Sequence, residues 1–436
     1  GIRLLITSSA SLDKYHGPID DVKSAYGLAF AASPVNFAAT YPADETYSWP
    51  HIRFGAVNTK TVNPYARIHR GYTDRSRYSA TTRVEYIHNL APILKGLEVR
   101  ANMSLNKTGY YHTPFSTHPF MYSLANYDFE TGKHTLNSLN DENAERTLHP
   151  ESASGYQMTQ VAYGAQVIHV AAWKEHQTSL TAVFNMQETT TSAARSVLEG
   201  IPQRNMGFSM RGSYGFKDKY FAEASFGYNG SERFDKGHQW GFFPSLGCAW
   251  IVSKESFLAD TSKWLSFLKL RFSWGQVGND GVIDKPRFTH LPVISESETT
   301  DPRPNRDMGN RYYVASYPNS KIKWEVAEQL NLGVETKFFS GLLELNADIY
   351  QEIRHNIIDY RITMPATMGL EEYQLANVGK VRSRGIDLAG KIQHAFSNDF
   401  WIILNGTFTY SKAVYKKIEE AVDKPEWQMR KNHEIS

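Results

Sequence analysis

The feature that most constrains this chain is an alternation of side-chain type with a period of two residues. It is clearest in MGFSMRGSYGFKDKYFAEASFGY at residues 206–228. Most even-numbered positions there are apolar, whereas the odd ones are mostly small, polar or charged. A charged turn interrupts this alternation, which then resumes with the even positions again apolar. Because successive side chains of a strand point to opposite faces, the stretch predicts a β-hairpin turning at Lys217, Asp218 and Lys219. Alternation alone leaves open whether the apolar face meets a second sheet, a helix or lipid.

Similar strand-like segments recur along the chain, and the connections between them alternate in length. Short turns are expected near 92–96, 174–178, 217–219 and 339–341, and near 397–399, with the longer 253–263 connection in the same group. Longer polar segments lie between them at 109–155, 189–204, 229–240, 277–322 and 359–378. A meander with tight turns at one end and large loops at the other is typical of outer-membrane barrels. A β-sandwich, with its crossover connections, gives no reason for loop lengths to segregate by end.

Composition is compatible with this fold and excludes several others. No stretch approaches the eighteen or so apolar residues of a transmembrane helix, and the mean hydropathy is −0.46. A barrel dilutes its hydropathy with lumen-facing residues, and the aromatic share of 13% fits either aromatic girdles or a glycan-binding sandwich. Cys248 is the only cysteine, so neither an intrachain disulfide nor a cysteine metal cluster can form. The formal net charge of +2 gives no electrostatic argument for nucleic acid.

The domain organisation predicted from these patterns is one barrel wall without internal boundaries. We expect residues 1–80 to form irregular strands and loops, because prolines interrupt them. Residues 81–413 are expected to form the strand meander, with long extracellular loops at 109–155, 277–322 and 359–378. Residues 414–436 are expected to form a loop, and both ends of the chain look truncated.

An ordered series of motifs resembles the SusC/RagA-like TonB-dependent outer-membrane transporters. The series includes GFFPSLGCAWIVS at 241–253, WLSFLKLRFSWGQVGNDGV at 264–282, WEVAEQLNLGVETKFFSGLLELNADIY at 324–350 and NVGKVRSRGIDLAG at 377–390. The resemblance implies part of a 22-stranded antiparallel up-and-down transmembrane barrel, with the family's plug domain absent from these residues. The positions that carry it, to which we assign structural roles, are Gly241, Phe242, Phe243, Pro244, Ser245, Gly278, Asn279, Asp280, Trp324, Glu325, Asn377 and Gly379.

Physical roles follow for three of these motifs. Pro244 cannot donate a ladder hydrogen bond, so it suits the start of a strand. Phe242 and Phe243 fit the aromatic belt where the membrane meets water. The glycines of the run that begins at Gly278 can adopt positive φ and turn the chain into the following loop.

The resemblance implies a transporter rather than an enzyme. It implies TonB-dependent import of oligosaccharides, or of other large nutrients such as peptides, across the outer membrane of a Gram-negative cell. Its partners would be a SusD-like surface lipoprotein, the TonB complex acting through a region outside this chain, and membrane lipid. No catalytic residue, metal site or cofactor is expected, and the ligand contacts we name are the loop aromatics Trp240, Tyr312 and Tyr313. The alternatives are a soluble all-β glycan-binding or glycan-degrading protein and a passive barrel.

Overall fold

The computed structural model describes residues 1–43, 50–194, 196–261, 263–281, 287–298, 310–370, 372–397, 399–421 and 423–435. Within these ranges one sheet of 14 strands dominates. Its strands, in spatial order, are β1 (Ile2–Pro18), β4 (Gly71–Asn89), β5 (Leu97–Ser116), β9 (Ser154–Trp173), β10 (His176–Thr191), β11 (Gln203–Phe216), β12 (Tyr220–Ser231), β13 (Trp240–Ile251), β14 (Leu265–Asn279), β17 (Glu325–Phe338), β18 (Leu343–Tyr360), β19 (Leu375–Ala395) and β20 (Trp401–Lys417), with the short β8 (His149–Pro150) beside β5.

Every neighbouring pair on this path is antiparallel, and nearly all the pairs are also consecutive wall strands. The hairpin of β11 and β12 turns at Lys217 and Asp218, as predicted, and both residues have positive φ (54° and 51°). Two successive positive φ values match the right-handed twist of the flanking strands, which explains how so tight a turn is tolerated.

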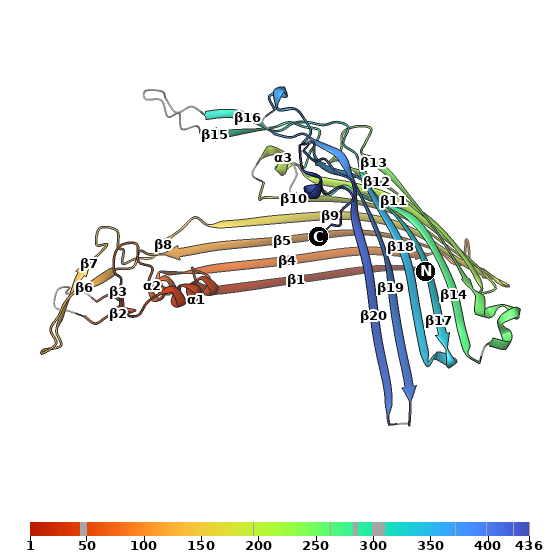
Figure 1. Cartoon of the computed structure of the whole chain (residues 1–436), viewed down its shortest axis with the longest axis horizontal. Helices are drawn as coiled ribbons and strands as arrows, with labels where there is room; N and C mark the ends of the chain where they lie inside the picture. The colour runs from red at the N-terminus through yellow and green to blue at the C-terminus, as the bar shows by residue number, and fades with distance from the viewer. Residues whose placement is uncertain are drawn as a thin grey trace.

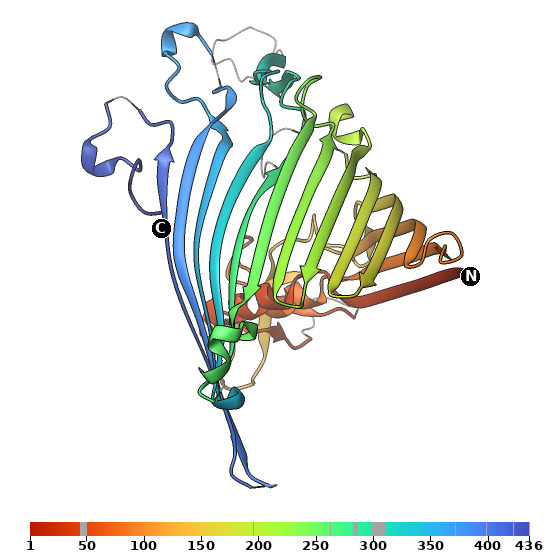
Figure 2. The ribbon, with the colours of Figure 1, turned by 90° about the vertical axis from the view of Figure 1, so that its right-hand side faces the viewer.

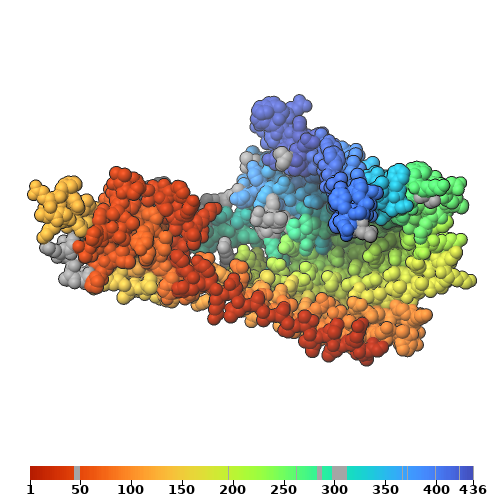
Figure 3. All heavy atoms as spheres, turned by 90° about the horizontal axis from the view of Figure 1, so that it is seen from below, coloured from red at the N-terminus to blue at the C-terminus, as the bar shows by residue number. Residues whose placement is uncertain are grey.

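The sheet forms a strongly twisted and curved wall. Strands β1, β4, β5 and β9 run nearly across the strands β17 to β20 in one view (Figure 1), and the turned view shows the curvature between them (Figure 2). Seen from below, the wall passes from β1 on one side through β13 to β20 on the opposite side (Figure 3). In the described ranges β1 has only β4, and β20 only β19, as a strand neighbour, so the sheet has two open edges.

The two ends of the wall differ in their connections, as the sequence predicts. The short connections at one end are residues 90–96, 174–175, 217–219, 339–342 and 396–400. The long connections at the other end are residues 19–70, 117–153, 192–202, 232–239, 280–324 and 361–374. The 252–264 connection at the short-turn end is longer than its neighbours because it holds the 3₁₀ turns η1 (Val252–Lys254) and η2 (Ser256–Thr261). We call the two ends the turn end and the loop end.

The long connections of the loop end contain structure of their own. Connections 19–70 and 117–153 build a separate four-stranded sheet, in which β3 and β6 pair in parallel. A two-stranded sheet, β15–β16, lies within connection 280–324 (Figure 1). The remaining elements are α1 (Val22–Ala31), β2 (Thr40–Tyr41), β3 (Arg53–Gly55), α2 (Pro64–His69), β6 (Met121–Tyr127), β7 (His134–Ser138), α3 (Val197–Gly200), β15 (Val293–Glu298), β16 (Asn310–Ser316), η3 (Phe339–Gly341), η4 (Ala366–Met368) and η5 (Glu426–Gln428).

The structure corrects the expectation for residues 1–80. β1 is a regular strand of 17 residues, and two helices follow it. The strand was missed because its side chains alternate poorly, with Leu4, Leu5 and Ile6 in one run and Ser8 and Ser9 in the next. β1 pairs with β4 in a continuous register through backbone hydrogen bonds. Because these bonds do not depend on side-chain type, they leave no pattern in the sequence.

Several loops are shorter than the sequence predicts, again because the side-chain alternation does not mark the ends of the strands. β5 continues through Ser116 into the expected 109–155 loop, β18 and β19 extend into 359–378, and β20 extends to Lys417 inside the expected terminal loop. These strands run beyond the part of the wall where one face is apolar, so the alternation ends before the ladder does. None of the helices in the described ranges has the length and apolar character needed to cross a bilayer.

Candidate functional site

One face of the wall is a continuous apolar surface. Across five strands, a single row of cross-strand partners reads Leu270, Val334, Ala347, Leu388 and Phe408. Leu388 and Phe408 are 44% and 59% exposed, so the row is covered by no other part of the chain described. Such a broad unpartnered apolar surface needs an apolar medium, because monomeric soluble proteins rarely expose contiguous patches beyond a few hundred Å².

Aromatic side chains border this apolar face at the turn end. The rings of Trp173 and His176 stack 5.4 Å apart, and the row continues through Phe216, Tyr220 and Trp250 with centroid separations of 6.4 and 6.3 Å between the last three. These residues come from the five adjacent strands β9 to β13, so the aromatic row runs across four neighbouring strand pairs. Rings with an apolar body suit the boundary between hydrocarbon and headgroups.

A second aromatic row lies toward the loop end. Trp240 stacks on Tyr228 with centroids 4.8 Å apart, and Phe226 packs 5.4 Å from Phe242. On β13 the two borders, Trp240 and Trp250, are separated by about 33 Å of strand at ~3.3 Å per residue. With a strand tilt of about 40°, this length spans ~25 Å, the height of the apolar band of an outer-membrane barrel.

A carboxylate outside the apolar band anchors the turn-end aromatic row. Glu255 accepts hydrogen bonds from the Tyr220 hydroxyl at 2.6 Å, from Trp250 Nε1 at 3.1 Å and from Lys219 Nζ at 3.1 Å. These donors, led by Tyr220, hold the pKa of the Glu255 carboxyl below its ordinary value. The polar ends of two belt residues are therefore fixed by one charged group.

The opposite face of the wall is polar, and its charges are mostly paired. Arg211 on β11 contacts Glu223 on β12 at 2.6 Å. Arg271 on β14 contacts Glu335 at 2.8 Å and Asp348 at 3.0 Å, bridging three strands. Since side chains on this face alternate with the apolar ones, polar and apolar surfaces lie on opposite sides of the same strands.

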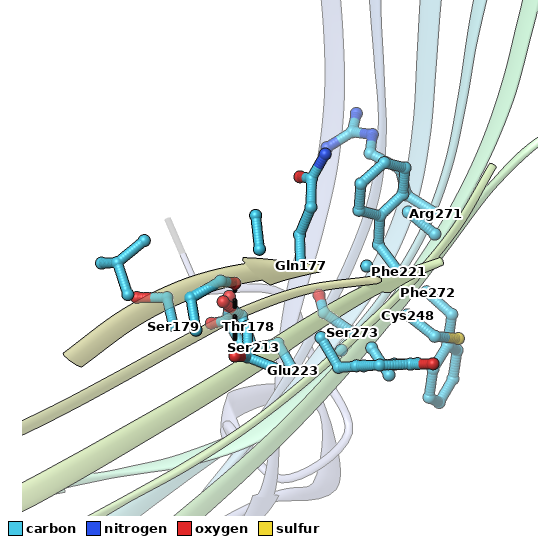
Figure 4. Close-up of a pocket in the computed structure, with 18 of the residues that line it drawn as sticks. Gln177, Thr178, Ser179, Ser213, Phe221, Glu223, Cys248, Arg271, Phe272 and Ser273 are labelled. Atoms are coloured by element: carbon cyan, nitrogen blue, oxygen red, sulfur yellow. Dashed lines mark hydrogen bonds between the residues drawn. The ribbon is translucent and has the colours of Figure 1, made fainter. Parts of the chain in front are cut away.

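Clefts lie along this polar face. One of about 570 Å³ is lined by residues of β9 to β14 and β17 near the turn end, and another of about 660 Å³ lies toward the loop end. Figure 4 shows Gln177, Phe221 and Arg271 extending to the same side of the sheet in the first of these clefts, while Cys248 and Phe272 lie on the other side. Most of the side chains that line these clefts are small or polar, so the polar face can accommodate a further segment or a passing ligand.

The motif residues meet at the loop end in an apolar cluster that we call the loop base. It consists of the buried Phe234, Ile322, Ile358 and Leu375 with Trp324 packed against them. Trp324 also contacts the ring of Phe243 edge-on, with centroids 5.3 Å apart, and donates from Nε1 to the carbonyl of Gln239 at 3.2 Å. The loop base thereby joins connections 232–239 and 280–324 to the loop ends of β18 and β19.

Polar motif residues complete the loop base. Glu325 is 8% exposed and accepts hydrogen bonds from the Ile358 backbone N–H at 2.8 Å and from Asn279 Nδ2 at 3.1 Å. Asn377 Nδ2 donates to the carbonyls of Lys323 and Asn356 at 2.8 and 2.6 Å, and its Oδ1 accepts from the Lys323 N–H at 3.0 Å. Side chains therefore satisfy backbone groups at loop ends that no strand partner reaches.

Three expectations for the motif residues were wrong in detail. Phe242 is 57% exposed beside the loop-end aromatic row, but Phe243 is only 8% exposed and packs into the loop base. Pro244 lies inside β13 rather than at its start, one residue before the β13–β14 ladder begins at Ser245, so its missing N–H breaks no bond to β14. Gly278 does not have positive φ, and a Cβ there or at Gly241 would overlap the Phe243 ring.

The other motif residues have local roles. Ser245 Oγ lies 2.6 Å from Ser225 Oγ across the polar face, and the Asp280 carbonyl accepts from Arg233 Nη1 at 3.3 Å. Gly379 leaves room for Ile357, whose Cβ would lie 2.9 Å from an added Cβ.

The loop aromatics expected to contact ligand do not share one element. Trp240 begins β13 and lines a cleft of about 340 Å³ together with Glu188, Arg204 and Glu232. Tyr312 and Tyr313 lie on β16, where the Tyr312 hydroxyl donates to Glu296 Oε1 at 3.3 Å. Trp240 is also held by its stacking on Tyr228, which favours the belt role over ligand binding.

Comparison with known proteins identifies the family. Residues 16–430 match the family model described as TonB dependent receptor-like, beta-barrel. The chain belongs to the TonB-dependent receptor β-barrel family. Its wall is therefore part of an outer-membrane barrel, with the apolar face toward lipid and the polar face toward the lumen. Receptors and transporters, rather than enzymes, make up this family, and its barrel fold favours the membrane protein over the soluble all-β alternative.

Among the relatives are two curated TonB-dependent receptors. SusC of Bacteroides thetaiotaomicron is 26% identical over 229 residues, which is 52% of this chain and 21% of that protein. Receptor P3 of Formosa agariphila is 26% identical over 213 residues, covering 49% of this chain and 20% of that protein. The matched stretch thus spans about a fifth of either relative.

Solved structures show the same fold. The RagAB peptide transporter aligns with a TM-score of 0.63 at 18% identity, covering 87% of this chain and 40% of that chain. The RagAB peptide importer in its closed-closed state gives 0.65 at 17% identity, covering 88% and 40%. The open edges at β1 and β20 are consistent with a wall that occupies part of such a barrel.

Proposed function

We propose that this chain is the barrel wall of a SusC/RagA-like TonB-dependent transporter that imports oligosaccharides, or other large nutrients such as peptides. The observation that carries the proposal is the two-sided wall: an apolar face bordered by two aromatic rows, backed by a cleft-bearing polar face. A wall of this kind encloses a polar passage through the membrane, and family membership supplies the link to TonB-driven transport.

Partners follow from the same proposal. A SusD-like surface lipoprotein would dock on the loop end, where connections 19–70, 117–153 and 280–324 build their own small sheets. The TonB complex would act from the turn end through a part of the protein outside this chain. The loop base supports this arrangement because Ile322 and Trp324 anchor connection 280–324 on a buried cluster.

The proposal is tested in cells that carry the full-length gene. Deletion should abolish growth on the transported nutrient, and deletion of TonB should have the same effect. Affinity purification of the tagged full-length protein should recover a SusD-like lipoprotein in stoichiometric amount. Growth that is unchanged by loss of TonB would contradict energised transport and support a passive barrel instead.

A further inference from the structure

The lumenal face of β1, β4, β5 and β9 carries a cleft that the proposed function leaves unassigned. Its volume is about 380 Å³, and its lining consists of Asp13, Tyr15, Arg75, Arg77, Tyr110 and Tyr156. These residues lie in the third of their strands nearest the loop end, below the connections 19–70 and 117–153. A ligand entering from the loop end would meet this cleft early.

The register explains why these side chains converge. Asp13 and Tyr15 on β1 lie opposite Arg77 and Arg75 on β4. Arg77 in turn lies opposite Tyr110 on β5, and Tyr110 opposite Tyr156 on β9. One cross-strand row therefore presents a carboxylate, a guanidinium and two phenols on the polar face, with a second guanidinium and phenol beside it.

The two arginines of the cleft differ from Arg83, Arg100 and Arg211 on the same lumenal face. Arg83 pairs with Glu85 at 3.6 Å and Arg100 with Glu98 at 2.6 Å, just as Arg211 pairs with Glu223. Within the described residues, no carboxylate lies within ion-pair distance of Arg75 or Arg77. Two guanidinium groups thus face the cleft against one carboxylate, Asp13.

Arg75 is held in place without being neutralised. Its Cζ lies 5.2 Å from the centre of the Tyr15 ring, and its Nε is buried without a hydrogen-bond partner. The guanidinium fork matches the two oxygens of a carboxylate, which it binds through paired charge-assisted hydrogen bonds. The cleft is therefore arranged for an anion with two oxygens in one plane.

The rest of the cleft fits a sugar better than a peptide. Tyr156 is 47% exposed, and Tyr15, whose ring has Arg75 over one side, is 44% exposed, so both rings present apolar surface to a flat group such as one side of a pyranose. Tyr110 lies between Arg77 and Tyr156 in the cross-strand row, with its ring centre 6.1 Å from that of Tyr156. The Asp13 carboxylate can accept hydrogen bonds only, which suits the hydroxyl groups of a sugar.

We propose that this cleft binds the carboxylate of a uronic-acid residue in an acidic oligosaccharide. Arg75 and Arg77 would hold the carboxylate, the exposed tyrosine rings would lie against the sugar ring, and Asp13 would accept from its hydroxyl groups. This inference rests on the proposed function because it assigns a substrate class to the lumen of that transporter.

The test is a binding measurement on the purified full-length protein in detergent. Isothermal titration calorimetry with tetragalacturonate should give saturable binding that weakens as salt is raised, and neutral maltotetraose of the same length should bind at least about tenfold more weakly. R75Q and R77Q should each weaken tetragalacturonate binding by about tenfold or more, since each variant loses charge-assisted hydrogen bonds to the carboxylate. R77K should lie between wild type and R77Q, because it keeps the charge and loses the planar fork.

The matched control is R83Q, on the same strand and the same face, whose arginine is already paired with Glu85. It should change the affinity by less than about twofold, and heat-modifiable migration on a gel should confirm that all variants are folded. Either arginine variant is sufficient if the other fails to fold. Equal binding of tetragalacturonate and maltotetraose, or wild-type affinity in both R75Q and R77Q, would overturn the proposal.

A peptide arm separates the ligand classes. If tetraglutamate binds with the same arginine dependence and tetragalacturonate does not, the cleft recognises a peptide carboxylate and the sugar assignment is wrong. The measurement needs neither TonB nor a membrane, so loss of TonB-dependent growth in cells and loss of binding in detergent are separate results. Binding can thus fail while transport of another nutrient succeeds.

Discussion

Leu270 and Arg271 are neighbours in β14, yet the surroundings that stabilise them have nothing in common. Leu270 is 40% exposed on the apolar face and depends on lipid outside the protein. Arg271 is held within the protein by Glu335 and Asp348 on two neighbouring strands. The outer face is therefore stabilised by the surrounding lipid and tolerates loose packing, whereas the inner face is stabilised by ion pairs between specific side chains.

The pair Phe242 and Phe243 shows the same contrast with identical side chains. Phe242 faces the membrane border and Phe243 turns into the loop base against Trp324. In the described part of the chain, the inner side of the wall therefore has its packed apolar cluster at the loop end, where the connections fold back on it. Four substitutions test whether the two sides of the wall are stabilised differently, and they follow in order of decreasing effect on stability.

Phe243→Ala should lower the free energy of unfolding by about 3–5 kcal/mol, because it empties a buried ring site beside Trp324. Phe242→Ala is the control and should cost less, since its ring is 57% exposed to the bilayer border. Urea unfolding of the full-length protein in detergent micelles measures both. Equal losses for the two variants would contradict the packed loop base.

Leu270→Arg should cost about 2–4 kcal/mol if the site lies near the bilayer midplane, because the new charge must be placed in hydrocarbon. Unfolding from liposomes is the appropriate measurement, and Leu270→Met serves as a volume-conserving control with a loss below about 1.5 kcal/mol. A loss for Leu270→Arg no greater than for the control would mean that this face does not contact lipid.

Arg271→Gln should cost about 1 kcal/mol or less, because the guanidinium is 37% exposed and its two ion pairs are screened by water. Its larger effect should be on permeation, since Asp348 then loses its arginine and Glu335 keeps only Lys269, which makes this part of the lumen more negative. Single-channel conductance measured with cations and anions detects the change. A loss of stability as large as that of Leu270→Arg would show that the facing is assigned incorrectly.

Glu255→Gln should make stability less dependent on pH at the turn end. The pKa of Glu255 is lowered below its ordinary 4.5 in the folded protein, so its ionised form stabilises the fold above about that pH. This contribution is lost as the pH falls through the folded pKa. Thermal unfolding at neutral pH should thus separate wild type from the variant, and the separation should shrink as the pH falls through the lowered pKa of the folded protein. A difference that is constant with pH would mean that the carboxylate charge is not responsible.

The wall was largely predictable from sequence because lipid on one side and water on the other impose a two-residue period. That constraint located the hairpin at Lys217 and Asp218 and the alternation around Leu270. It failed for β1, where Leu5 lies on the polar face and Ser8 on the apolar one, so the side chains carry little pattern.

The interior of the loop end was predictable only as a set of motif residues. Nothing in GFFPS distinguishes Phe242 from Phe243, because the ring that packs against the second one, Trp324, lies at the distant end of connection 280–324. Gly278 was assigned to a turn, whereas its role is to leave space for that ring. The cleft of Arg75 and Arg77 was missed because its residues come from four strands, and the absence of acidic partners is visible only once the register is known.

The parallel pairing of β3 with β6 has a consequence for the order in which the protein assembles. Phe54 and Gly55 pair with Met121 and Tyr122, so this small sheet links two connections that flank the β4–β5 hairpin. Hairpins closed by short turns form early because their contacts are local, whereas a parallel ladder between distant segments must wait for both to be delivered. We therefore expect the wall strands β4 and β5 to insert first and the β3–β6 contact to close last, on the outer side of the membrane, as the step that completes the loop end.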